Sequence, residues 1–369
     1  MATETFNYIP NPNFPNRYIL PKRLENYLQA NLSDYISELG FSTNGQKIYK
    51  ATFGYGTIKI LAWSQMHGNE SNATHAMLDL LTTLQDSKSL ADELWSKISL
   101  DFIFMLNPDG SLAWTRRNAH NIDLNRDYNM MSSKEFPLLK KIAMEGNYHY
   151  ALNLHEQRTL FSTDGIHPAT LSFLAPAEDV DRTVTETRKK AMAVITAIVD
   201  GMKEFIPNQI ARYNDEFYPN STGDNFTKMG LPTILYEGGH FQNDYLRKET
   251  RKYYTIAFYE GLKAIIKLNG TSDGWEKYFE LPENKEDHFD IIYRNVSLDT
   301  DFSSVVDIAV QYKEQILEGY DEITFLPMVV EVGDCGKKKG WKEIDCKGKK
   351  FVSKDKFPKI DEIQNFEIL

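Results

Sequence analysis

Apolar runs that end in polar or turn-forming residues recur along the first two thirds of the chain. Four runs have this form: residues 58–64, 100–106, 150–154 and 232–237. The first run is followed by His67, the second by the turn Asn107-Pro-Asp-Gly110, and the third by His155. Short apolar runs bounded by turn residues are typical of buried strands. Because ligands bind beyond the carboxyl ends of the strands in open α/β sheets, the four ends predict one shared site.

Stretches with helical spacing of apolar positions lie between and after these runs. They are residues 72–81, 182–205 and 244–268. The last stretch ends at Asn269-Gly270, a helix stop signal. Strands that alternate with helices predict an α/β fold. Beyond residue 270 the pattern changes, and residues 303–312 and 322–332 indicate strands. We therefore expect two domains, residues 1–270 and a small β-rich domain at 271–369.

Composition and charge narrow the class of protein. With 369 residues, 41% apolar and 25% charged, the chain is typical of globular proteins and long enough to bury a large core. A net charge of −10 argues against a general nucleic-acid binder. The segment 335–359 is basic, with ten lysines against three acids. A solvated face or protection of an edge strand is the favoured interpretation of this charge run, and docking to an anionic surface is the alternative.

The chain has no run of about 18 apolar residues, so no membrane span is expected. Its first ten residues lack the basic and then apolar layout of a secretory signal. Two cysteines are too few for a disulfide scaffold. The expected location is therefore cytoplasmic.

The segment His67-Gly-Asn-Glu70 places an imidazole and a carboxylate three residues apart, where they can converge on one cation. Catalytic zinc usually takes three protein ligands and keeps an open position for water. His155, at the end of another apolar run, is the candidate third ligand. Glu237 ends a fourth run and is a candidate general base. Each residue alone is more typical of a structural or solvated side chain, so their order along the chain carries the prediction.

Between the two histidine segments lies the polar stretch 115–128, which contains Arg116-Arg-Asn118 and Asp123-Leu-Asn-Arg126. The order HxxE, NPDG, RxN, DLNR, His, Glu resembles the zinc metallocarboxypeptidases, the carboxypeptidase A-like peptidases. The resemblance covers roughly residues 50–265. It implies a three-layer α/β/α domain with a mixed sheet, followed here by the β-rich appendage.

The resemblance also implies roles for the residues around the metal. Glu237 would be the general base and acid, and Arg116 would polarise the scissile carbonyl, with Arg117 as the alternative. Asp123 is similar to the acid that orients the first histidine ligand. One zinc ion per chain would be held by the three ligands His67, Glu70 and His155.

Substrate binding is implied for a second group of residues. Asn125 and Arg126 resemble the pair that grips the terminal carboxylate, a task that suits a planar guanidinium. The family tyrosine that covers the substrate has no clear counterpart here: Tyr213 and Tyr218 are both candidates, and each also fits a structural role. Of the two, we take Tyr218. Asp224 lies near the position of a pocket-wall aspartate, where it is either structural or selects basic side chains.

Three residues differ from the pattern of the better-known zinc metallocarboxypeptidases. Glu156 and Arg158 follow His155 where many relatives carry small hydroxyl residues, and His240 follows Glu237 closely. Glu156 and Arg158 could change which substrate charge is accepted. His240 is either a partner of a site residue or an ordinary turn residue.

Together these patterns predict a zinc-dependent hydrolase that cleaves a C-terminal peptide bond or amino-acyl amide bond. A zinc-dependent deacylase of N-acyl amino acids on the same fold is the first alternative. A non-catalytic metal-binding scaffold is the second, and it is disfavoured because the ligands and the base are all present. The expected partner is a peptide or acyl-amino-acid substrate, without nucleic acid or membrane.

Overall fold

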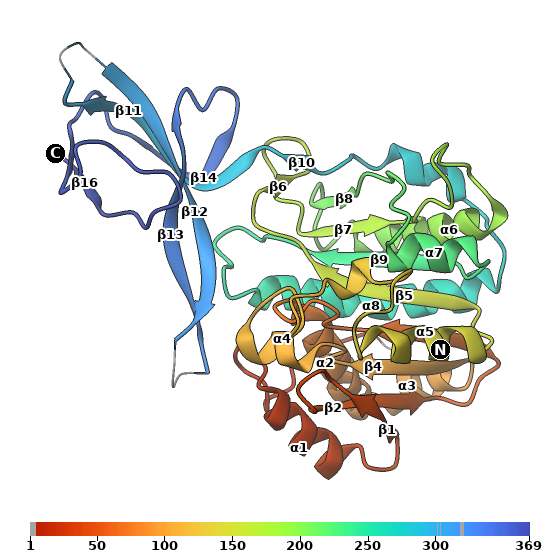
Figure 1. The fold of residues 1–369 in the computed structure, drawn as a ribbon. Helices are drawn as coiled ribbons and strands as arrows, with labels where there is room; N and C mark the ends of the chain where they lie inside the picture. Colours follow the sequence, from red (N-terminus) through yellow and green to blue (C-terminus); the bar gives the residue numbers. More distant parts are fainter. Residues whose placement is uncertain (1–4, 301, 303, 318–320) are drawn as a thin grey trace.

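A computed structural model describes residues 5–300, 302, 304–317 and 321–369 (Figure 1). Its centre is an eight-stranded mixed sheet in the order β1-β2-β4-β3-β5-β9-β7-β8. The strands are β1 (Ile36–Phe41), β2 (Lys47–Phe53), β3 (Ile58–Trp63), β4 (Ile98–Phe104), β5 (Tyr150–Glu156), β7 (Leu171–Leu174), β8 (Ile210–Arg212) and β9 (Thr233–Gly238). The four predicted strands, β3, β4, β5 and β9, are neighbours in this sheet.

These four central strands run parallel. In the register, Ala62 pairs with Phe102 of β4 and Leu152 of β5, while His155 pairs with Glu237 of β9. Flanking pairs β2–β4 and β7–β9 are antiparallel, which makes the sheet mixed. The carboxyl ends of the predicted strands therefore meet at one edge, as their sequence pattern predicts.

Helices cover both faces of the sheet. One layer holds α1 (Pro21–Asn31), α2 (Asn72–Asp86), α3 (Lys88–Trp95), α6 (Glu186–Met202) and α8 (Lys248–Leu268), and the other holds α5 (Phe136–Glu145) and α7 (Thr222–Lys228). Side chains of β3 point alternately to the two faces of the sheet. Ile60 and Ala62 pack against the layer that contains α2 and α8, and Leu61 and Trp63 pack against the layer of α5 and α7. This arrangement confirms the three-layer α/β/α fold.

The three predicted helices are present as α2, α6 and α8, with bounds that shift by a few residues. Helix α2 continues five residues beyond the predicted end at residue 81. Helix α6 begins at Glu186, after Thr185 accepts a hydrogen bond from the backbone N–H of Arg188. Asn269 and Gly270 both have positive φ and end α8. No helix in the described part of the chain is long and apolar enough to cross a membrane.

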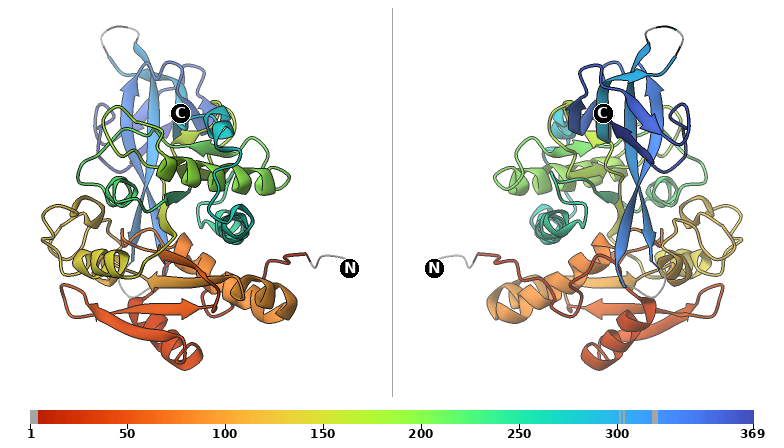
Figure 2. Two further views of the ribbon diagram at one scale, coloured as in Figure 1. Left: turned by 90° about the vertical axis from the view of Figure 1, so that its right-hand side faces the viewer. Right: turned by 90° about the vertical axis from the view of Figure 1, so that its left-hand side faces the viewer.

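The region after residue 280 is rich in strands, as predicted. A four-stranded sheet has the order β13-β12-β11-β14. Its strands are β11 (His288–Leu298), β12 (Ser304–Ile316), β13 (Ile323–Gly333) and β14 (Lys339–Asp345), and β15 (Phe351–Ser353) pairs with β16 (Phe366–Ile368). Residue 303, the start of one predicted strand segment, lies outside the described residues. The long β12–β13 hairpin extends from this sheet toward the α/β domain (Figures 1 and 2).

Several contacts join the two parts of the chain. Strand β10 (Lys285–Glu286) pairs with β6 (Phe161–Ser162), which follows β5 closely. The 3₁₀ helix η2 (Trp275–Glu280) places the buried Tyr278 in the core beside α6. A boundary at residue 270 thus stays a prediction, since η2 lies after it and packs with the α/β core.

Candidate active site

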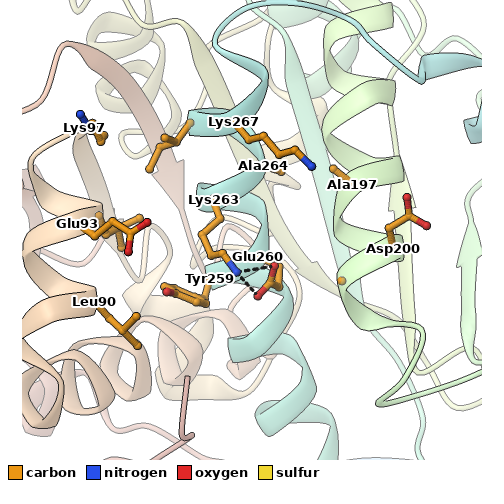
Figure 3. Close-up of a pocket in the computed structure, with 13 residues that line it drawn as sticks. Leu90, Glu93, Lys97, Ala197, Asp200, Tyr259, Glu260, Lys263, Ala264 and Lys267 are labelled. Atoms are coloured by element: carbon orange, nitrogen blue, oxygen red, sulfur yellow. Dashed lines mark hydrogen bonds and ion pairs between the residues drawn. The ribbon is translucent and has the colours of Figure 1, made fainter. Parts of the chain in front are cut away.

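A cleft of about 1050 Å³ lies at the carboxyl ends of β3, β5 and β9. It is lined by every residue that the sequence predicts to bind metal or substrate or to act in catalysis: His67, Glu70, Arg116, Asn125, Arg126, His155, Tyr218, Asp224 and Glu237. A second hollow, of about 490 Å³, lies between α3, α6 and α8 and contains none of these residues (Figure 3). The predicted residues are therefore gathered at one place.

Three buried side chains form a cluster that could hold a metal ion. His67 lies in the loop after β3, Glu70 just before α2, and His155 near the end of β5. The Nδ1 atoms of the two histidines are 3.1 Å apart, and each lies 2.8 Å from a different carboxylate oxygen of Glu70. All potential ligand atoms lie within 4.8 Å of one another. The loop, the helix start and the strand end thus bring three potential ligands to one point.

Asp123 and Arg116 surround the first histidine. The Oδ1 atom of Asp123 is 3.1 Å from His67 Nε2, and its Oδ2 accepts a hydrogen bond of 3.0 Å from Arg116 Nε. Arg116 Nη1 lies 3.1 Å from His67 Nδ1. Arg117 instead donates to the backbone carbonyl of Asn121 and does not line the cleft. Of the two adjacent arginines, Arg116 is therefore the one that reaches the cluster.

The charges of this cluster depend on one another. Burial alone would lower the pKa of His67, but the Glu70 charge and the contact with Asp123 outweigh it and raise that pKa. Burial lowers the pKa of His155, although Glu70 opposes the shift. The two histidines hold the pKa of Glu70 well below its usual range, despite burial. Glu70 is therefore an ionised carboxylate beside two imidazoles.

Glu237 enters the cleft from β9, directly beside His155 in the strand pairing. Its Oε2 is buried and has no hydrogen-bond partner among the described residues. Burial, followed by the negative charge of Glu70, raises the pKa of Glu237 well above its ordinary value. A carboxyl group in this position can take up a proton and release it again, because it is not engaged elsewhere.

The predicted carboxylate-binding residues lie together at the rim of the cleft. Asn125 is buried in the short 3₁₀ helix η1 (Leu124–Arg126), and its Oδ1 accepts a hydrogen bond from the backbone N–H of Thr222. Arg126 is exposed, and its guanidinium lies 5.1 Å from the ring centre of Tyr218. No acidic partner pairs with Arg126 in the described part of the chain. Its Nη1 donates a hydrogen bond of 3.0 Å to the backbone carbonyl of Asn125, so no acid among the described residues competes with an anion for this guanidinium.

Tyr213 and Tyr218 occupy different parts of the cleft. Tyr213 packs against Phe161 at 5.5 Å, and burial with the nearby charge of Glu237 raises its pKa. Tyr218 is 45% exposed and stacks near Arg126. Asp224 is buried, and its Oδ2 accepts a hydrogen bond from the Tyr218 backbone N–H. Burial raises the pKa of Asp224 to about 6, so this carboxyl group is close to neutral in weakly acidic solution.

A buried ionic network beside the metal cluster was not expected from the sequence. Arg17 pairs with Glu156 at 3.1 Å and with Glu314 of β12 at 2.5 Å. The carboxylate of Glu156 also accepts a hydrogen bond from the backbone N–H of Asn72. Arg17 lies far along the chain from both acids, in a segment without a recognisable motif. Only the apolar run before Glu156 could have hinted that this acid needs a buried partner.

The other departures from the family pattern also have defined positions. Arg158 lines the cleft, is 72% exposed and lies 3.6 Å from Glu286. His240 is buried and does not line the cleft, and its ring contacts Tyr245 and Trp341, both at 5.2 Å. Glu156 and Arg158 both line the cleft, but Glu156 is engaged by Arg17, whereas Arg158 is mostly exposed.

Comparison with known proteins agrees with this geometry over part of the chain. Residues 26–153 match the zinc carboxypeptidase family. Over 100 residues the chain is 31% identical to carboxypeptidase 2 of Trichophyton rubrum and to probable carboxypeptidase 2 of Trichophyton verrucosum (strain HKI 0517). These alignments cover 27% of this chain and 19% of the relatives, so the chain matches about a fifth of their length.

Solved structures with the same fold include a metallo-carboxypeptidase from Burkholderia cenocepacia, with a TM-score of 0.52 and 16% identity, covering 67% of this chain and 68% of that one. The carboxypeptidase A from Helicoverpa armigera has a TM-score of 0.53 and 14% identity, covering 69% and 73%. At these identities the likeness concerns the fold. Residues 26–153 therefore resemble the zinc carboxypeptidase family in sequence, and the α/β domain has the fold of these carboxypeptidases.

Proposed function

We propose that the chain is a zinc-dependent hydrolase that removes a C-terminal residue from a peptide or cleaves an amino-acyl amide bond. The observation that carries the proposal is the convergence of His67, Glu70 and His155 beside an unengaged Glu237. The match to the zinc carboxypeptidase family supports the same chemistry, but the matched segment 26–153 ends before His155 and Glu237. The roles of these two residues therefore rest on geometry.

The cluster suits a zinc ion. Ligand atoms of tetrahedral zinc lie roughly 2.0–2.1 Å from the metal and hence about 3.3 Å from one another. The separations of 3.1 Å between the two Nδ1 atoms and 2.8 Å to Glu70 are close to that value. Two imidazoles and one carboxylate are also a ligand set typical of catalytic zinc. When bound, zinc would supply a Lewis acid and an acidified water molecule.

The chain's own residues would then divide the work. Glu237 takes a proton from the attacking water and later delivers it to the leaving amine. Arg116, which is 44% exposed and held by Asp123, stabilises the negative charge that develops on the carbonyl oxygen. Asn125 and Arg126 hold the terminal carboxylate, and Tyr218 lies beside them. Asp224 shapes the adjoining pocket.

Two alternatives from the sequence stay open. A zinc-dependent deacylase of N-acyl amino acids would use the same metal and base, because its substrates also carry a free α-carboxylate. It would also use Asn125 and Arg126, which we name the carboxylate clamp. A non-catalytic metal-binding scaffold would have no use for a carboxyl group kept unpaired at the position of Glu237. A cytoplasmic location stays a prediction.

Metal analysis tests the ligand set. Purified protein is expected to hold one zinc ion per chain, and His155→Ala should lose it because two ligands leave the ion poorly coordinated. His167→Ala is the matched control, since His167 is 40% exposed and pairs with Asp164. Unchanged zinc content in His155→Ala would remove this residue from the site.

A second variant separates ligation from catalysis. Glu237→Gln should keep zinc while kcat for peptides with a free C-terminus falls by at least ~10²-fold, the usual contribution of a general base. Glu186→Gln, at an acid that is 74% exposed, should keep both properties. Full activity in Glu237→Gln would assign proton transfer to another group.

A further inference from the structure

One wall of the cleft belongs to the C-terminal region. It is formed by the hairpin of β12 and β13, residues 304–316 and 323–333, which we name the β-arm. Tyr312 and Glu314 from β12 and Phe325 and Met328 from β13 line the cleft. The family match does not extend to these residues. The role of the β-arm is therefore argued from its own contacts.

The β-arm is packed firmly against fixed parts of the α/β domain. Tyr245, in the loop between β9 and α8, contacts the ring of Tyr312 at 5.1 Å and that of Phe325 at 5.7 Å. Trp114 Nε1 donates a hydrogen bond of 3.2 Å to Glu314, which also pairs with Arg17. Aromatic packing and a partly buried ion pair hold the hairpin at two points, so it forms a wall with a defined position.

The β-arm and the carboxylate clamp flank the metal cluster from opposite layers of the fold. Asn125 directly follows Leu124 in the chain, and Asp224 lies two positions before Phe226. Leu124 and Phe226 both pack in the layer of α5 and α7. The β-arm instead meets Arg17, whose carbonyl accepts a hydrogen bond from Ser71 at the start of α2 in the other layer. A substrate held by its carboxylate at the clamp would extend its acyl side toward the β-arm.

We infer that the β-arm limits the length of the substrate on the acyl side of the cleaved bond, with Tyr312 and Phe325 as specificity-determining residues. This inference rests on the proposed function. The enzyme would accept acyl groups of about one or two residues, or an N-acyl amino acid, because a cleft near 1050 Å³ is at the upper end of small-molecule sites. Longer peptides would meet the hairpin.

The two acids at this wall are not free to hold a longer chain. Glu314 and Glu156 both pair with Arg17, so their carboxylates are already engaged. The aromatic rings and Met328 recognise size and shape, and the exposed Lys313 of β12 also lines the cleft. We assign the length limit to Tyr312 and Phe325, because both rings are fixed against Tyr245.

The experiment uses the full chain with zinc and a series of N-acetylated peptides. The C-terminal residue is randomised, and the acyl side contains zero, one, two, four or six residues. We expect kcat/KM to fall at least tenfold between one and six residues. Hydrolysis of none of the series would overturn the proposed function itself. Hydrolysis with equal or rising kcat/KM for long peptides would overturn only the length limit.

Variants assign the limit to the wall. Tyr312→Ala and Phe325→Ala should raise the ratio of kcat/KM for six-residue to one-residue acyl groups at least fivefold. Met328→Trp should lower that ratio, because it adds bulk at the same wall. Phe357→Ala is the matched control, since this aromatic residue is 42% exposed and does not line the cleft.

Circular dichroism checks that each variant is folded. If the alanine variants do not fold, Met328→Trp alone decides the question, since it tests the same wall with the opposite sign. An unchanged ratio in the folded variants would show that the β-arm does not set the limit.

Discussion

The two walls of the cleft are built in opposite ways. On the clamp side, Asp123 Oδ1 accepts a hydrogen bond from the backbone N–H of Asn125, two positions away, and Arg126 follows directly. On the β-arm side, Arg17 joins acids that are 139 and 297 positions away. The first wall is a local motif on a 3₁₀ turn, and the second exists only when distant segments have folded together.

This difference predicts which property a substitution in each wall should change first. A local motif depends little on the rest of the chain, so changes there should affect substrate binding more than folding. The charged groups of the ion network lost most of their hydration when the chain folded. Removing one of them leaves its partners without an opposite charge and with little water to stabilise them. Changes on the β-arm side should therefore appear first as lost stability.

The largest expected effect is that of Arg17→Met. The substitution leaves the Glu156 and Glu314 carboxylates without their shared cation. Removing one partner of a buried ion pair typically lowers the free energy of unfolding by about 3–5 kcal/mol. Urea unfolding followed by circular dichroism measures the loss. Stability within 1 kcal/mol of wild type would contradict the account of the network.

Two further variants make that measurement specific. Arg158→Met removes a cation from a pair that is 3.6 Å long and mostly exposed, so it should change stability by less than about 0.5 kcal/mol. Adding Glu156→Gln and Glu314→Gln to Arg17→Met should restore part of the loss, because neutral amides are easier to bury than unpaired carboxylates. No recovery would indicate that lost packing, not charge, dominates.

Asp224→Asn tests the pocket on the clamp side. Burial raises the pKa of Asp224 to about 6 from an ordinary value of 3.8, so between these values the folded state binds more protons than the unfolded state. Wild-type stability therefore falls as pH rises through this window, whereas the neutral Asn residue makes no such contribution. At pH 8 the variant should be more stable by about 1–3 kcal/mol, and at pH 4 the two should be nearly equal.

Thermal unfolding from pH 4 to pH 8 measures this difference. Asp181→Asn, at an exposed position, is the control and should follow the wild-type profile. A constant stability difference across the range would mean that Asp224 does not titrate in that window.

The smallest effect concerns the clamp itself. Amidation of the substrate's C-terminus should lower kcat/KM by roughly tenfold, and ~1.4 kcal/mol corresponds to that factor. A buried guanidinium would give a larger effect, but Arg126 is exposed, and screened charges contribute less. Arg126→Ala should lose most of the preference for a free carboxylate.

Arg117→Ala should keep that preference, because Arg117 donates to the backbone carbonyl of Asn121 and does not line the cleft. Equal turnover of amidated and free peptides by the wild-type protein would remove the clamp and favour an endopeptidase or another amide substrate.

Much of the fold could be predicted because each central strand is an uninterrupted apolar run of the chain. The runs around Ile60 and Leu152 are buried on both faces, so their composition alone marks them as inner strands. The short strands β7 and β8 and the bend at η2 were not predicted, since their few residues are shaped by the sheet edge on which they pack. The β-arm was expected as strands but not as a wall of the site.

The sequence by itself determined the candidate ligands, their order and the edge of the sheet where they emerge, because each motif lies within a few residues of a strand end. Only the tertiary structure decided which of Arg116 and Arg117 reaches the cluster, that Glu156 is engaged by Arg17, and that a C-terminal hairpin borders the cleft. These outcomes depend on contacts between segments up to 297 positions apart. The energy of such contacts comes from burial and mutual charge, which no local pattern of residues encodes.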